Sequence, residues 1–130
     1  MSKQNVSGNL AVKGYDVTAY FDGEAELGDP AIALEYEGAR FYFVNEESKK
    51  RFEASPNQFV PAYGGFCAYA MSNATQFDVD PRSFKVVDDR LFLFYDGVGG
   101  KTIDLWNQNE AERLEKADEN WHAGNFAPPS

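Results

Sequence analysis

Two stretches of the chain have the hydrophobic pattern of β-hairpins. Residues 32–36 and 40–44 are rich in aliphatic and aromatic side chains, and a turn around Glu37 and Gly38 separates them. Residues 83–87 and 91–95 show the same pattern around a second, acidic turn. A charged segment with helical features follows each pair. The pattern therefore predicts two similar halves, each made of an aromatic hairpin and a helical segment.

Capping residues and three- and four-residue spacing mark the helical segments. Asn45 suits an N-cap, and residues 48–55 are expected to form a helix that Pro56 ends. Apolar residues between Ile103 and Trp121 recur at helical spacing, which predicts a single amphipathic C-terminal helix packed on the sheet. Hairpins that are each followed by helices predict an α+β fold.

The connecting segments complete the predicted organisation. Residues 18–21 are strand-like in composition, and residues 96–100 contain three glycines and are expected to form a flexible turn. A length of 130 residues suits one domain. We expect this domain to cover residues 10–126, with a disordered polar tail at 1–9 and a short tail at 127–130.

Composition and charge exclude several classes of function. The formal net charge of −9 repels phosphate backbones and anionic lipid, which argues against nucleic-acid and peripheral membrane binding. No apolar run approaches the roughly 20 residues that a membrane span needs, so membrane insertion is not expected. The first 14 residues lack the apolar region of a signal peptide. We expect a cytoplasmic protein if the chain is complete, and an exported one if a signal peptide has been removed.

The stretch between the two halves, residues 61–71, contains the single cysteine. Gly64 and Gly65 allow a sharp backbone turn, and Phe66 to Met71 are expected to begin an apolar helix. Cys67 would then lie in the first helical turn, where the helix dipole can lower a thiol pKa. Cys67 and Met71 are four residues apart and would share one helix face, as a soft pair suited to Cu(I). The alternative is that both are core side chains.

Three further side-chain groups are candidates for binding or chemistry. His122 is the only histidine, and it could complete a metal site with Cys67 and Met71 if the C-terminal helix covers the central stretch. Otherwise His122 is a solvated surface residue. Tyr63, Tyr69 and Tyr95 could line an apolar pocket for a small ligand, the alternative being a place in the core. No pairing of a nucleophile with a base stands out, so an enzyme is not expected.

One segment resembles a known domain family. Residues 36–59 run as tyrosine, acidic residue, glycine, aromatic strand, helix with a phenylalanine, proline and final aromatic residue, and this order resembles a YHS domain. Residues 14–21, 63–68 and 116–121 extend the resemblance to small stand-alone YHS-domain proteins. The resemblance implies an α+β fold and a role in heavy-metal handling, as in the related TRASH-like metal-binding domains.

The chain departs from that family at the metal-ligating positions. Family members that bind metal carry a cysteine just after the aromatic strand and another four residues later, where this chain has Val44 and Ser48. Residues 16–19 stand in place of the N-terminal cysteine motif, and they contain no sulfur. The resemblance therefore implies the fold without the family's usual metal site.

These observations favour a small non-enzymatic binding domain of YHS type. It would take a soft transition metal such as Cu(I), or a small ligand, near Cys67. A thiol redox protein or sensor that uses Cys67 as a low-pKa thiol is the first alternative. A protein-interaction module that docks a partner through its acidic face or an aromatic cleft is the second.

Overall fold

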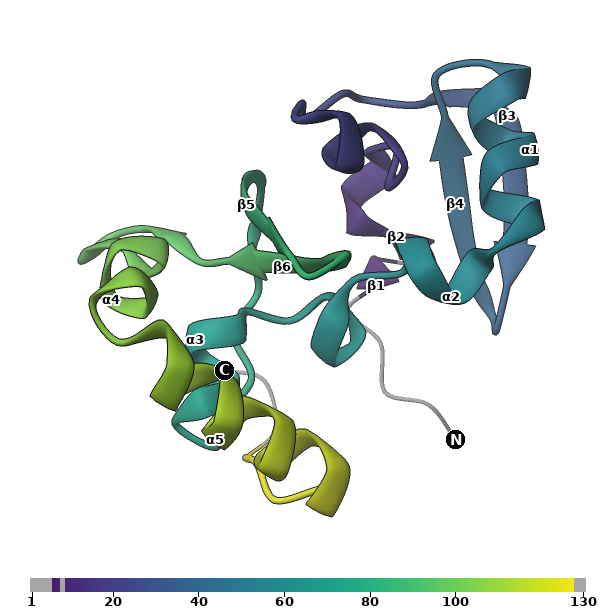
Figure 1. Cartoon of the computed structure of the whole chain (residues 1–130). Coiled ribbons are helices and arrows are strands. Elements are labelled where there is room, and N and C mark those ends of the chain that lie inside the picture. The colour runs from purple at the N-terminus through teal and green to yellow at the C-terminus, as the bar shows by residue number, and fades with distance from the viewer. Residues whose placement is uncertain (1–5, 8, 128–130) are drawn as a thin grey trace.

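The computed structural model describes residues 6–7 and 9–127, and it has the α+β architecture that the sequence predicts (Figure 1). Strands β3 (Asp29–Tyr36) and β4 (Ala39–Phe43) form the first hairpin. Two short strands, β1 (Val6–Ser7) and β2 (Leu10–Ala11), extend it into a sheet of order β1-β2-β4-β3. The domain was expected to begin at residue 10, but strand β1 lies before it. Of the other residues in the two expected tails, the structure describes only Asn9 and Ala127.

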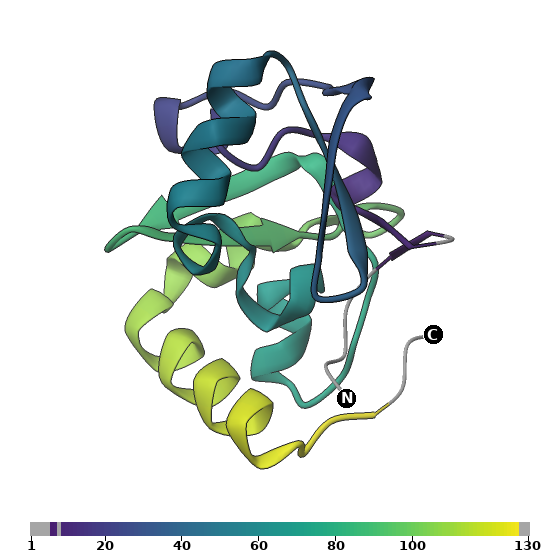
Figure 2. The same ribbon diagram turned by 90° about the vertical axis from the view of Figure 1, so that its right-hand side faces the viewer.

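The second hairpin consists of β5 (Asp80–Val87) and β6 (Arg90–Phe94), as predicted. It lies across the middle of the molecule, with the first hairpin and its helix on one side and the C-terminal helices on the other (Figure 2). The segment expected to be a flexible turn instead forms a small hairpin of β7 (Asp96–Gly97) and β8 (Gly100–Lys101).

The predicted helices are present, but two of their boundaries differ. Helix α1 (Glu46–Ala54) begins after Asn45, whose Oδ1 accepts a hydrogen bond of 2.9 Å from Ser48 N. Pro56 does more than end this helix, because it occupies the first turn of α2 (Pro56–Phe59), where its missing N–H costs nothing. The predicted single C-terminal helix is two helices, α4 (Thr102–Gln108) and α5 (Glu110–Ala123). The extended backbone of Asn109, with φ of −155°, separates them.

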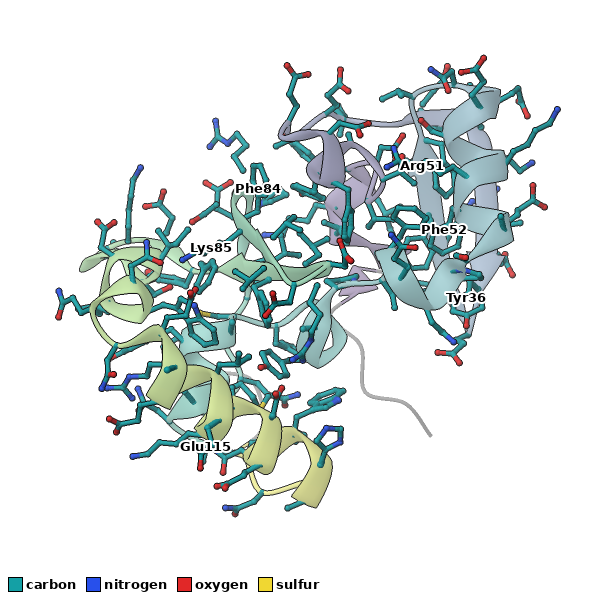
Figure 3. The ribbon with its side chains drawn as sticks, in the orientation of Figure 1. Tyr36, Arg51, Phe52, Phe84, Lys85 and Glu115 are labelled. Carbon is teal, nitrogen blue, oxygen red and sulfur yellow. The ribbon has the colours of Figure 1, made fainter. Side chains whose placement is uncertain are left out.

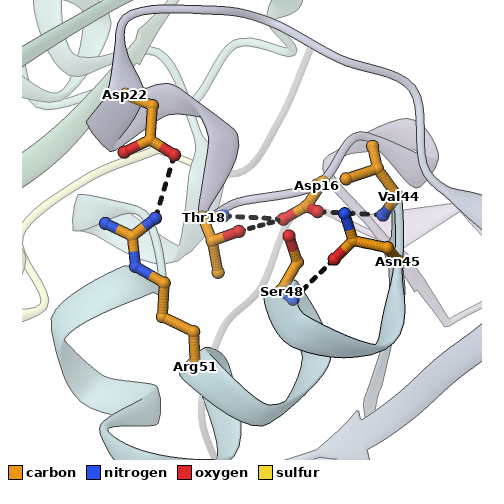
Figure 4. A network of polar contacts seen from close by, with 7 residues as sticks. All are labelled: Asp16, Thr18, Asp22, Val44, Asn45, Ser48 and Arg51. Atoms are coloured by element: carbon orange, nitrogen blue, oxygen red, sulfur yellow. Dashed lines mark hydrogen bonds and ion pairs between the residues drawn. The ribbon is translucent and has the colours of Figure 1, made fainter.

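Short helical turns connect these elements: η1 (Val12–Gly14), η2 (Ala19–Asp22), η3 (Ala62–Gly65) and the five-residue helix α3 (Ala68–Ser72). The predicted strand at residues 18–21 is wrong, because this segment forms η2. Asp16, which is fully buried, accounts for the difference (Figure 4). Its Oδ1 accepts hydrogen bonds from Thr18 N and Thr18 Oγ1, and its Oδ2 accepts one from Val44 N at the end of β4. The carboxylate thereby closes a local turn and prevents an extended chain.

The two hairpins repeat one arrangement at a spacing of 51 residues. Asp29 pairs with Phe43 as Asp80 pairs with Phe94, and both hairpins have a register shift directly after this pair. Both close with a two-residue loop in which each residue has positive φ, which matches the right-handed twist of paired strands. We call residues 10–60 repeat 1 and residues 61–123 repeat 2.

The repeat extends to the core that covers each hairpin. Phe52 of α1 is fully buried and points into the interior (Figure 3), with its ring centroid 4.9 Å from that of Phe41 and 5.3 Å from that of Phe43. Trp106 of α4 is also fully buried, at 5.5 Å from Phe92 and 5.6 Å from Phe94. Aromatic rings therefore join helix to hairpin in the same way in both repeats.

The turns before each hairpin also correspond. Val12, Lys13 and Gly14 have φ of 50°, 53° and 87°, and residues 63–65 follow at the same spacing with 57°, 63° and 85°. Two residues further on, Asp16 N donates a hydrogen bond to Glu26 O and Cys67 N donates one to Phe77 O. Cys67 of repeat 2 thus occupies the backbone position that Asp16 occupies in repeat 1.

None of the helices in the described ranges has the length and apolar character that crossing a membrane would need.

Candidate functional site

A cleft of about 340 Å³ lies between the two repeats. We call this site the inter-repeat cleft, because both repeats contribute apolar and aromatic walls to it. These walls include Val12, Tyr36 and Phe41 from repeat 1, and Tyr63, Leu91 and Trp121 from repeat 2. Its volume lies at the lower end of the range for sites that bind small molecules. Equivalent segments of the two repeats, η1 and η3, both contribute to its lining.

Tyr63 forms a buried aromatic wall of the inter-repeat cleft. Its side chain is 2% exposed, and its backbone has φ of 57° in the sharp turn that precedes Cys67. The expected turn at Gly64 and Gly65 is confirmed, and it includes Tyr63 itself. Tyr63 Oη donates a hydrogen bond of 2.8 Å to Asp118 Oδ1, so the polar end of the ring is bound within the protein.

Arg90 lines the cleft beside this tyrosine, and Asp118 holds both side chains in place. Arg90, the first residue of β6, donates two hydrogen bonds to Asp118 of α5, at 2.9 and 3.1 Å. The Arg90 guanidinium also lies over the rings of Tyr63 and Phe92, at 5.9 and 5.1 Å from their centroids. Aromatic faces attract cations, so the guanidinium is held by a carboxylate and by two rings at once.

Charge and burial shift the ionisation of this group of side chains. Burial raises the pKa of Tyr63 above its ordinary value, and the adjacent Asp118 carboxylate raises it further. Burial alone would raise the pKa of Asp118, but hydrogen bonds from Arg90 and Tyr63 outweigh it, and the pKa is lowered. Tyr63 therefore keeps its proton and donates a hydrogen bond, and Asp118 stays ionised and accepts that bond.

The far end of α5 forms the rim of the cleft. Trp121 is half-buried, with its ring centroid 6.3 Å from that of Tyr63, and on its other side it stacks on Phe126 at 5.5 Å. Trp106, by contrast, packs on Phe92 and Phe94 of the second hairpin. His122, which is exposed, lines the same rim.

Cys67 lies away from this cleft, at the N-cap of α3 rather than in its first turn. Its side chain is fully buried, and its Sγ lies 3.3 Å from Thr102 Oγ1 and 3.5 Å from Ala70 N. Thr102 Oγ1 donates its proton to Tyr95 O, which leaves the thiol to donate to the threonine. These contacts fix α3 against the start of α4.

The three residues expected to hold a metal lie in two places. Cys67 and Met71 are both fully buried on or beside α3, as the core alternative predicts, whereas His122 is exposed on α5. The lining of the cleft that contains His122 includes neither sulfur residue. Within the described part of the chain, no three His, Cys, Asp or Glu side chains are grouped so that they could hold a metal ion.

The three tyrosines expected to share a pocket are also separated. Only Tyr63 lines the inter-repeat cleft. Tyr69 is half-buried on α3, where Arg113 of α5 lies over its ring at 4.9 Å. Tyr95 lines a second, polar depression between β5 and β7, and its Oη donates a hydrogen bond to Val98 O. One of the three candidates therefore belongs to the site described here.

Sequence reasoning missed Arg90, Asp118 and the cleft position of Trp121. Arg90 and Asp118 are 28 residues apart, and nothing in the local pattern of either segment indicates that they meet. The available signal was the turn at residues 63–65, because a sharp turn between two similar halves places its neighbours at their junction.

No known family model, curated protein or solved structure matches the chain. The resemblance to YHS domains therefore stays a prediction from the residues quoted above.

Proposed function

We propose that this protein is a small non-enzymatic binding domain that holds a small, largely apolar ligand in the inter-repeat cleft. The observation that carries the proposal is the aromatic lining of one concave site by Tyr63, Trp121 and Tyr36, from three separate elements. Concave sites with mostly apolar walls and a few fixed polar groups are the usual form of small-molecule sites.

The polar groups of the cleft are held in place before any ligand arrives. Tyr63 and Arg90 are both bound to Asp118, and Tyr36 Oη donates a hydrogen bond of 2.6 Å to Asn57 Oδ1. Walls that are already ordered lose little conformational entropy when a ligand binds. This supports a binding role over a structural one for the cleft.

The two tryptophans of the chain give a direct test. Trp121 lines the cleft, whereas Trp106 is fully buried in the core, where its Nε1 donates a hydrogen bond to Glu110. In a two-dimensional amide spectrum with a library of small aromatic and aliphatic fragments, ligands should shift the indole signal of Trp121 and leave that of Trp106 in place. A library that shifts neither signal, or only residues away from the cleft, contradicts the proposal.

Variants separate cleft binding from general effects on folding. Trp121→Leu should weaken binding of every ligand found, because it removes the ring that closes the rim. Phe77→Leu is the matched control, since Phe77 is 37% exposed and contacts Tyr95 rather than the cleft. Equal affinity for wild type and Trp121→Leu would place the ligand elsewhere.

Binding of a soft metal ion near Cys67 is the competing proposal that the sequence raised. Its test is a titration of wild type and Cys67→Ser with Cu(I), Zn(II) and Cd(II). If wild type binds these ions no better than the variant, Cys67 is not a ligand. The enclosed thiol, with its contacts to Thr102 and Ala70, favours that outcome.

A further inference from the structure

The electrostatic character of the inter-repeat cleft indicates which ligands it suits. The one arginine or lysine among its described lining residues is Arg90, and Asp118 lies against that guanidinium with two hydrogen bonds. Arg90 therefore brings no unbalanced positive charge. Asp89, beside it in the hairpin loop, adds a carboxylate, and the whole chain carries a formal charge of −9.

The aromatic rings add to this preference. The face of an aromatic ring is the negative end of its quadrupole, so a cleft lined by tyrosine and tryptophan rings attracts cations. Arg90 already shows this chemistry inside the protein, since it lies over Tyr63 and Phe92 while it binds a carboxylate. Trp121 and Tyr36 present further rings to the same cleft.

We propose that the ligand of the inter-repeat cleft is a small organic cation, with an ammonium or guanidinium group attached to an apolar body. The apolar body fills the cleft against Val12, Phe41 and Leu91, and the cationic group lies between the ring of Trp121 and the carboxylate of Asp89. This inference rests on the proposed function and specifies its ligand.

Three probes with the same aromatic body test the charge preference. Phenethylamine is cationic at pH 8, phenethyl alcohol is neutral and phenylacetate is anionic. The amine should bind about tenfold more tightly than the alcohol, a ratio typical of a partly desolvated cation–π contact, and phenylacetate should bind most weakly. The readout is the indole signal of Trp121, with that of Trp106 as the internal reference.

Two variants locate the preference in the cleft. Asp89→Asn should lower the affinity for the amine severalfold and leave that for the alcohol unchanged. Glu115→Gln, on α5 but not in the lining of the cleft (Figure 3), changes the net charge equally and should have no such effect. If both variants reduce amine binding equally, the attraction comes from net charge alone and the proposed site is wrong.

The outcomes distinguish this inference from the proposed function. If the alcohol binds as well as the amine, or the three probes leave Trp121 unshifted while other fragments shift it, the cation preference is overturned and the binding cleft stands. If no fragment of any charge shifts Trp121, the proposed function falls and this inference falls with it. A preference for the amine that is lost in Asp89→Asn and kept in Glu115→Gln supports both.

Discussion

Tyr63 and Asp118 lie 55 residues apart in the sequence, yet Tyr63 Oη donates a hydrogen bond of 2.8 Å to Asp118 Oδ1. Together with Arg90, this contact joins the turn at residues 62–65, the start of β6 and the helix α5. Three elements that are distant in the chain thus form one rigid wall of the cleft. The integrity of that wall depends on the charge of a single carboxylate.

Replacement of Asp118 by asparagine should therefore lower stability in a pH-dependent way. The pair with Arg90 is only partly buried, with side chains 43% and 30% exposed, so we expect a loss of about 1 kcal/mol at pH 7. Because the folded state lowers the pKa of Asp118 from its ordinary value of 3.8, this contribution is complete above that pH. It is lost as the pH falls through the lower, folded value.

Urea unfolding of wild type and Asp118→Asn at pH 7 and below pH 3 measures this difference. The two midpoints should differ at pH 7 and converge in acid. Glu112→Gln is a suitable control, because Glu112 pairs with Lys116 on the exposed side of the same helix. A difference that stays constant across this range would mean that the charge of Asp118 is not what stabilises the wall.

The buried carboxylate of Asp16 should be far less tolerant of substitution. Asp16→Asn keeps one acceptor oxygen, but it turns an N–H group toward Thr18 or toward the Val44 N–H, which then has no acceptor. We expect a loss of about 2–3 kcal/mol in the free energy of unfolding. The exposed Asp22, paired with Arg51, provides the comparison: Asp22→Asn should cost less than about 1 kcal/mol. Chemical denaturation of both variants decides; equal losses would contradict the role assigned to Asp16.

Gly28 should not tolerate even the methyl side chain of alanine. A Cβ at this position would lie 2.5 Å from the carbonyl carbon of Tyr42, which is backbone and cannot rotate away. Gly28→Ala should therefore cost at least about 2 kcal/mol, within the range of overpacked cores. At Gly38 nothing lies within 4 Å, and the only penalty is its φ of +80°, so Gly38→Ala should cost about 1 kcal/mol. Thermal unfolding that ranks these two variants in the opposite order would contradict the close approach.

The thiol of Cys67 should react slowly in the folded protein. Its side chain has no exposed surface, so a thiol reagent such as DTNB reaches it only when the structure opens. The native protein should label much more slowly than the same protein in denaturant. The measurement is the rate of release of the coloured leaving group. Rapid labelling of the native protein would restore the low-pKa thiol as a candidate for redox chemistry.

Much of the fold could be predicted because its signals are local. The two hairpins follow from apolar runs with turn residues between them, and α1 follows from the N-cap at Asn45. The sequence also indicates two similar halves, although not that residues 29–43 and 80–94 share one register. The fold class was therefore accessible from short-range patterns.

The errors have physical causes that local patterns do not reveal. Residues 18–21 have the composition of a strand, but the carboxylate of Asp16 closes them into a turn by contact with β4, which is distant in sequence. Apolar spacing continues from Ile103 to Trp121, yet Asn109 interrupts the helix as Ser55 does in repeat 1. The φ angle is −153° at Ser55 and −155° at Asn109, so the helix is broken in the same way in both repeats. A proline follows the break in repeat 1 but not in repeat 2.

The candidate site was the least predictable feature. Tyr63 was identified as a ligand-binding candidate, whereas Arg90 and Asp118 become partners only when repeat 2 folds back on itself. Cys67 and Met71 have the spacing of a ligand pair, but the same spacing suits two side chains of a core. Burial, which separates these alternatives, depends on what the rest of the chain places over α3.

The break at Asn109 assigns different tasks to the two ends of α5. Its first turn corresponds to α2 of repeat 1, which ends at Phe59, whereas α5 continues to Ala123. The longer helix brings Trp121 and His122 to the cleft and Asp118 to the guanidinium of Arg90. Those last turns have no counterpart in repeat 1. Substitutions there could retune which molecules the protein accepts while both hairpins and their aromatic cores stay intact, so the scaffold and its selectivity are free to diversify separately.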